Sequence, residues 1–155
     1  MRRTLTFLLF CVSPLMGLAQ EERINELLDA WHQAASEANA DSYFDLLADD
    51  GYFLGTDSSE VWTKEEFYGF SKPYFDKGKA WSFKATRRKV FFSSNEKVAW
   101  FEETLDTWMG PCRGSGVLEK EKGEWKLKQY NLAVLVANDD IQEYLKILKG
   151  KSADE

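Results

Sequence analysis

The chain has 155 residues, of which 44% are hydrophobic and 15% aromatic, enough for one packed domain and too many for a disordered segment. Its 20 basic and 26 acidic residues give a formal net charge of −6, and no basic patch is visible that would hold nucleic acid or anionic lipid. With one histidine and two cysteines, we expect no metal site and no cofactor.

The first nineteen residues have the pattern of a secretory signal peptide. Two arginines precede an apolar run that ends at Val12, and small residues stand at positions 17 and 19, where a signal peptidase reads them. We expect cleavage between Ala19 and Gln20 and export of the mature chain to the periplasm or the outside of a bacterial cell. Loss of both arginines takes the net charge from −6 to −8. The alternative is a buried amino-terminal helix.

Helices are predicted first along the chain. Residues 21–39 carry apolar side chains at spacings of three and four, as in an amphipathic helix. Asp41 or Ser42 is expected to cap a short second helix that ends in a turn at 49–51. A short strand at 52–54 and a polar loop at 55–60 follow. The segment 63–66, Thr-Lys-Glu-Glu, has the spacing of a capping box for a third helix, which Pro73 should kink or end.

From residue 80 the hydrophobic period changes to two, which predicts strands. They are expected at 81–92, 98–108, 113–121 and 124–136, with turns between them and a hairpin turn at Lys122-Gly123. A last helix should run from Asn138 or Asp139 to Lys149, with a polar disordered tail at 151–155. The fold class is therefore α+β, with one domain at 20–150 whose helices cover one face of a curved antiparallel sheet.

Four segments resemble the SnoaL-like group of the nuclear transport factor 2-like, or ketosteroid isomerase-like, superfamily. They are FLGTD at 53–57, VAWFEETL at 98–105, CRGSGVL at 112–118 and WKLKQYNL at 125–132. The resemblance implies a cone-shaped, cystatin-like fold with helices on the concave face of the sheet and a pocket at its open end. It does not choose a function, because the superfamily holds isomerases, dehydratases, cyclases and non-enzymatic modules.

The catalytic residues of these relatives are largely unmatched. The general-base position of the ketosteroid isomerases falls on Gly55, with Asp57 two residues further on. Their oxyanion-donating tyrosine falls near Ala34. The late-strand imidazole of the polyketide cyclases is replaced by Asn131, and an amide does not shuttle protons near neutral pH.

The expected pocket is aromatic, with a few polar groups that would orient a ligand. Its candidate ligand-binding residues are Trp31, Tyr52, Trp62, Trp100, Arg113, Gln129 and Asn131. Alternation along the last strand predicts that Trp125, Leu127, Gln129 and Asn131 share one face.

Catalysis would need an inward carboxylate, and the candidates are Asp57, Glu102 and Glu103, with Arg113 as a charge partner. Sequence alone leaves open which strand acid points inward. Cys112 is expected to be buried and His32 to be structural.

Three hypotheses follow. The first is a domain that binds a small apolar molecule. The second is an isomerase, dehydratase or hydrolase that uses a pocket carboxylate. The third is an assembly module that forms a homodimer through the open sheet face.

Overall fold

The computed structural model describes residues 13–151. In chain order the elements are α1 (Ser13–Ser36), α2 (Ala40–Leu46), β1 (Leu47–Leu54), β2 (Val61–Thr63), α3 (Lys64–Asp76), β3 (Lys84–Phe92), β4 (Val98–Thr107), β5 (Gly110–Glu121), β6 (Glu124–Val134), a 3-10 turn η1 (Asn138–Asp140) and α4 (Ile141–Lys151).

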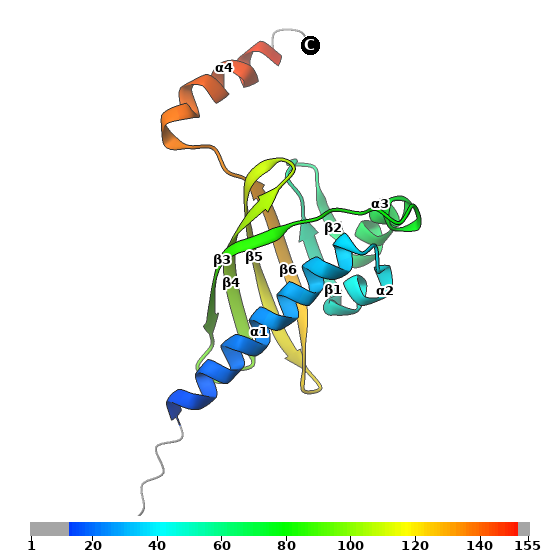
Figure 1. Cartoon of the computed structure of the whole chain (residues 1–155), viewed down its shortest axis with the longest axis vertical. Coiled ribbons are helices and arrows are strands. Elements are labelled where there is room, and N and C mark those ends of the chain that lie inside the picture. The colour runs from blue at the N-terminus through cyan, green and yellow to red at the C-terminus, as the bar shows by residue number, and fades with distance from the viewer. Residues whose placement is uncertain (1–12, 152–155) are drawn as a thin grey trace, which may run out of the picture.

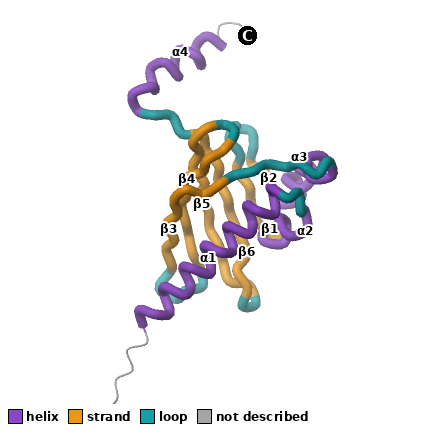
Figure 2. Tube along the Cα trace, viewed as in Figure 1, coloured by secondary structure: helices purple, strands orange, loops and turns teal. Residues whose placement is uncertain are grey.

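The strands form one sheet in the order β2-β1-β6-β5-β4-β3. The pairs β3–β4, β4–β5 and β5–β6 are antiparallel, as the alternating pattern predicts for a meander, and β2 pairs antiparallel with β1. The pair β1–β6 is parallel, so the first long strand lies beside the last. Figures 1 and 2 show α1 crossing one face of the curved sheet, with α2 and α3 at one side. The predicted α+β cone with helices on its concave face is confirmed.

The core lies between the helices and the concave face. From α1, Ile24, Leu28 and Trp31 point into it at the spacings of one helix face. The sheet contributes alternate residues of each strand, such as Ala99, Phe101 and Leu105 on β4. Cys112 is buried there too, as expected.

Local signals in the sequence fix several boundaries. The capping box is present: the Thr63 side chain accepts from the Glu66 N–H, and Glu66 accepts from the Thr63 N–H. The hairpin turn at Lys122-Gly123 forms with positive φ angles of 52° and 94°, as a tight β-turn of this handedness requires. Pro73 lies inside α3, which continues to Asp76, so it does not end the helix.

Both ends of α2 differ from the prediction. The cap of α2 is Asn39, whose side chain accepts from the Ser42 N–H at 3.0 Å, and not Asp41 or Ser42. The helix also ends at Leu46, and β1 already begins at Leu47. Gly51, read from the sequence as a turn, lies inside β1, where an added Cβ would sit 2.9 Å from the Leu127 carbonyl oxygen. This close approach of β1 to β6 is the reason for a glycine there.

The last strand contains a β-bulge that changes which side chains face the core. Val117 pairs with Gln129 and Leu118 with Leu127, so Lys128 is the extra residue on β6. Trp125 and Leu127 before the bulge are buried, whereas after it Tyr130 and Leu132 are buried. The prediction that Gln129 and Asn131 share a face with Trp125 is therefore wrong, because one inserted residue inverts the alternation.

The described part of the chain begins at Ser13 and ends at Lys151. Residues 1–12 of the expected signal peptide and 152–155 of the expected tail lie outside the described residues. Helix α1 begins at Ser13 and passes through the expected cleavage point at Ala19-Gln20. Within residues 13–151, no helix combines the length and the apolar character that crossing a membrane requires. Helix α4 projects away from the sheet (Figure 1).

Candidate functional site

An apolar cavity of about 360 Å³ opens at the end of the sheet where the β4–β5 hairpin and the β1–β2 loop lie; we call it the mouth pocket. Its lining comes from β1, the β1–β2 loop, β2, α3, the segment before β3, the β4–β5 turn and β6. The residues are Phe53, Gly55, Thr56, Glu60, Trp62, Phe67, Phe70, Tyr74, Ala80, Trp81, Phe83, Trp108, Met109 and Leu132. A volume of this size suits a small organic molecule.

Stacked rings form one wall and the floor of the mouth pocket. Trp62 of β2 stacks on Phe70 of α3, with ring centroids 4.7 Å apart and planes at 21°. Below them Phe67 stacks on Phe53 at 3.8 Å and 14°. Phe67 is buried while Phe70 is 45% exposed, so the stack runs from the core to the surface. This arrangement offers flat apolar surface to a ligand.

The pocket holds few charged groups. Among the described residues that line it, Glu60 is the one carboxylate, and no lysine or arginine takes part. Oε2 of Glu60 accepts a hydrogen bond from the Asp57 N–H at 3.1 Å, and the Gly55 N–H donates to the Glu60 carbonyl at 2.9 Å. Glu60 therefore holds the β1–β2 loop together, which leaves the pocket surface mainly apolar.

A second feature, the buried ion network, lies deeper, between α1 and the sheet. Its centre is Glu103 of β4, which has no solvent exposure. One carboxylate oxygen is 2.9 Å from Nε2 of His32 and accepts from the Tyr130 hydroxyl at 3.0 Å. The other accepts from Nε of Arg88 at 2.8 Å. Burial alone would raise the pKa of Glu103, but the hydrogen bond and charge of His32 and the charge of Arg88 outweigh it and lower this pKa.

Arg88 links the network to α1. Its Nη1 donates to the Asn25 carbonyl at 3.1 Å, and its Nη2 lies 2.9 Å from the Asp29 carboxylate. Nη2 also lies 2.8 Å from Glu103, although the angles of these two contacts are not those of hydrogen bonds. The network thus ties β3 and β4 to the first helix through charges and hydrogen bonds.

Gly114 of β5 lies directly beside Glu103, with which it pairs in register. A Cβ added to it would sit 2.3 Å from the Tyr130 hydroxyl and 2.7 Å from Oε1 of Glu103. The space that a side chain would fill on β5 is therefore used by the network. Burial, followed by the Glu103 charge, raises the pKa of Tyr130 well above its ordinary value, so the hydroxyl keeps its proton at neutral pH and donates a hydrogen bond to Glu103.

Aromatic rings separate the network from the mouth pocket. Phe53, which lines the pocket, packs against Tyr130 with centroids 5.4 Å apart, and Phe83 packs edge-on to His32 at 6.5 Å. Neither Glu103, His32 nor Tyr130 is among the described residues that line the pocket. Glu103 is therefore paired on both carboxylate oxygens and separated from the mouth pocket by aromatic rings.

The structure does not bring the seven expected ligand-binding residues together. Trp31 is buried under Tyr43, with its indole N–H donating to the Tyr43 carbonyl, and Trp62 lines the mouth pocket. Five lie on the outer, convex face of the sheet instead, namely Tyr52, Trp100, Arg113, Gln129 and Asn131. They therefore do not share one cavity with Trp31 and Trp62.

The expected acid–arginine pair is also arranged differently. Glu103 is the inward acid, and its partner is Arg88 and not Arg113. Arg113 lies on the outer face, 3.9 Å from Glu102, which is paired mainly with Arg87. Asp57 is exposed and accepts from the Ser59 N–H and hydroxyl; the hydroxyl bond, then the backbone bond, lower its pKa. Arg113 does not reach Glu103 because it pairs in register with Thr104, and the Thr104 side chain points to the outer face of the sheet.

The partners of Glu103 were not among the predicted site residues, although the sequence holds signals for them. His32 is one helical turn beyond the buried Leu28, and Arg88 has the strand parity of Val90 and Phe92. A charged residue on an apolar face needs a buried partner. For the pocket residues Phe70, Trp81 and Trp108, no local signal distinguishes lining from core.

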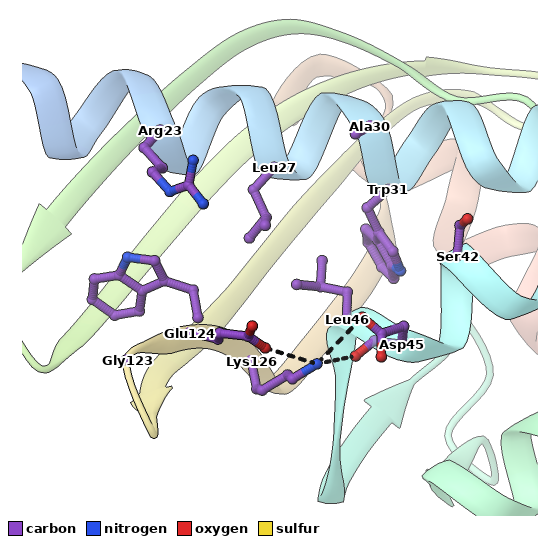
Figure 3. A pocket seen from close by; sticks show the side chains of 11 residues that line it. Arg23, Leu27, Ala30, Trp31, Ser42, Asp45, Leu46, Gly123, Glu124 and Lys126 are labelled. Carbon is purple, nitrogen blue, oxygen red and sulfur yellow. Dashed lines mark hydrogen bonds and ion pairs between the residues drawn. The ribbon is translucent and has the colours of Figure 1, made fainter.

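A second cavity, of about 330 Å³, lies between α1, α2 and the β5–β6 turn (Figure 3). Arg23 and Leu27 reach into it from α1, and Lys126 lies opposite. Nζ of Lys126 is held by the Asp45 carbonyl at 2.8 Å and the Asp45 carboxylate at 3.3 Å. Its charged groups come in both signs and are largely exposed, so it is a less defined site than the mouth pocket. Over residues 13–151, no three His, Cys, Asp or Glu side chains gather as metal ligands would.

The fold and the apolar cavity at its open end define a pocket-bearing domain of the nuclear transport factor 2-like class. More narrowly, the family model described as SnoaL-like domain matches residues 24–137, and the chain belongs to that family. No curated protein sequence matches the chain significantly.

Solved structures agree on the fold. An NTF2-like protein of unknown function from Pseudomonas putida superposes with a TM-score of 0.65 at 14% identity, covering 79% of this chain and 91% of that one. A putative scytalone dehydratase from Novosphingobium aromaticivorans gives 0.64 at 13% identity, covering 77% and 87%. The association domain of C. elegans CaMKII gives 0.62 at 18% identity, covering 76% and 97%. At such identities the likeness concerns the fold alone.

Proposed function

We propose that this chain is an exported domain that binds a small apolar molecule in the mouth pocket. The observation that carries the proposal is the lining of that pocket, in which stacked rings form a wall and a floor and one engaged carboxylate is present. Burial of apolar surface is the main source of affinity in such a site.

The same observations favour binding over catalysis. A general base must reach the substrate and needs an available protonation site. Glu103 is saturated by His32, Arg88 and Tyr130 and lies behind Phe53 and Phe83. Glu102 is paired with Arg87 on the opposite face of the sheet. Glu103 would meet a substrate only after a rearrangement of the core, and Glu102 points away from the mouth pocket.

Filling the mouth pocket should abolish binding. Ala80 is a partly exposed residue of the lining, so Ala80→Trp places an indole in the cavity with little change to the core. Native mass spectrometry of the purified protein should show an added mass in the wild type and none in Ala80→Trp. Ala137→Trp, at an exposed alanine outside the pocket, is the matched control and should keep the added mass.

If the wild type carries no added mass and takes up neither an aromatic nor an aliphatic alcohol in calorimetry, the binding function is wrong. The chain mass in the same spectra shows which residue the protein begins with. After expression in a bacterium, a mature chain that begins at Gln20 would support export. An intact chain that begins at Met1 would contradict it.

Self-association is a second proposal, supported by apolar side chains that the monomer leaves exposed. On α4 these include Ile141, Tyr144 and Leu145 at the spacing of one helix face. On the convex face, Phe91 stacks on Trp100 with both rings exposed. An 11-residue helix is marginal in water unless another surface covers it. A second copy of the chain is the partner we propose.

Charging this helix face should therefore dissociate the protein. We expect the wild type to be a dimer by light scattering at micromolar concentration and Leu145→Glu to be a monomer with an unchanged β-sheet spectrum. Gln142→Glu, an exposed change on the same helix, adds the same charge and should stay dimeric. A wild type that is monomeric at this concentration would remove the proposal.

A further inference from the structure

Trp108 is the most exposed large apolar side chain among the described residues, at 80%. It is the first residue of the tight turn between β4 and β5, and it stands at the rim of the mouth pocket. Single exposed apolar residues are common on protein surfaces. An indole left in water beside an apolar cavity is different, because a ligand in that cavity would cover it.

The backbone beneath Trp108 is held in place. The Thr107 hydroxyl donates to the Gly110 carbonyl at 2.9 Å and accepts from the Met109 N–H at 3.0 Å. Gly110 has φ of +88°, which other residues rarely adopt, so glycine suits the end of this turn. The hairpin thus fixes the backbone position of Trp108. Its exposed side chain can adopt different rotamers, including one that covers the pocket.

The opposite wall of the pocket is flat. In the sheet order, β1 and β6 lie between β2, which carries Trp62, and the β4–β5 hairpin, which carries Trp108. Phe53 of β1 and Leu132 of β6 therefore form the floor between these two walls. The stacked rings of Trp62 and Phe70 present one flat aromatic surface. Trp108 lines the same pocket from the β4–β5 turn. A planar ring placed between them gains stacking on both faces.

The charged groups of the lining further restrict the class of ligand that the pocket can bind. No cation lines the pocket in the described chain to receive an anion, and Glu60 is engaged with the Asp57 N–H. A charged ligand would lose its hydration without a partner. We propose that Trp108 is the specificity-determining rim residue of this site and closes over an uncharged, planar aromatic ligand. This inference rests on the proposed binding function.

The experiment compares two uncharged alcohols of similar hydrophobicity, 2-naphthol and 1-octanol, by isothermal titration calorimetry. We expect 2-naphthol to bind about tenfold more tightly, the effect of an aromatic pair worth up to about 1.5 kcal/mol. Trp108→Ala should remove most of this preference by weakening 2-naphthol about tenfold and 1-octanol less than twofold. Trp100→Ala, at an exposed tryptophan on the convex face, is the matched control and should change neither affinity.

The position of the bound ligand relative to Trp108 is measured separately, by fluorine NMR of protein labelled with 5-fluorotryptophan. The sequence has six tryptophans, and the resonance missing from Trp108→Phe assigns that of Trp108. We expect 2-naphthol to shift this resonance and to leave that of Trp100 in place. A shift that follows protein concentration instead of 2-naphthol would assign Trp108 to a contact between copies and overturn the inference.

Two failures can be told apart. Equal binding of both alcohols, or equal losses in Trp108→Ala, would overturn the role of Trp108 while the binding function stands. Failure of both alcohols to bind the wild type would overturn the function and this inference together.

Discussion

Glu103→Ala should lower the free energy of unfolding by about 3–5 kcal/mol, the cost of removing one partner from a buried ion pair. The loss leaves the Arg88 guanidinium, which is nearly buried, without its central carboxylate, and leaves His32 and the Tyr130 hydroxyl without an acceptor. Domains of this size are stable by about 5–15 kcal/mol, so the variant should be close to unfolding. Urea denaturation followed by circular dichroism measures the change.

The neighbouring acid is the control for Glu103. Glu102 lies one residue away on the same strand, on the convex face, with its side chain 28% exposed and paired with Arg87. Glu102→Ala removes the same group from a solvent-exposed pair and should cost about 1 kcal/mol or less. Equal losses for the two variants would show that the buried ion network does not stabilise the fold.

Acid should remove the contribution of Glu103. Its pKa is lowered in the folded protein, so the unfolded chain binds more protons at low pH than the folded one. The stabilisation is complete above the unfolded value of about 4.3 and is lost as the pH falls through the lower folded value. The difference in unfolding free energy between wild type and Glu103→Gln should therefore shrink below about pH 4.

Most of the fold can be predicted from local patterns of the sequence, because those patterns depend on contacts between residues that are close in the chain. The period of two from residue 80, the Thr63–Glu66 capping box and the Lys122-Gly123 turn each depend on contacts within a few positions, and each forms. The cap of α2 shows the limit of such signals. Asn39, Asp41 and Ser42 are all good caps, and the choice of Asn39 follows from where α1 ends.

The site is harder to predict because it depends on long-range pairing. His32 and Glu103 are 71 residues apart, and parity along each strand identifies the inward acid only when the register is known. The bulge at Lys128 then inverts the last strand, so Gln129 and Asn131 leave the face on which the alternation placed them. Only the folded sheet fixes which aromatic residues end in the core and which line the mouth pocket.

Phe67→Ala should cost about 3–5 kcal/mol, as expected for removing a buried phenyl ring. This ring is buried beneath the mouth pocket and contacts the rings of Phe53, Trp62 and Trp81, with centroids 3.8, 5.6 and 5.8 Å away. Its loss leaves a cavity that surrounding stacked rings cannot close without moving α3. Thermal and urea unfolding should both report the change.

Phe70 provides a matched control on the same helix. It is the same residue type one turn nearer the surface, and its ring is 45% exposed. Phe70→Ala should cost only about 1 kcal/mol of stability. It removes the outer ring of the stacked wall, however, so it should weaken 2-naphthol binding in a protein that stays folded. Two variants of one helix would then separate the residue that holds the pocket in shape from the residue that meets the ligand. If Phe70→Ala proved as destabilising as Phe67→Ala, the stack would be a structural unit throughout, and its outer ring could not be assigned to binding.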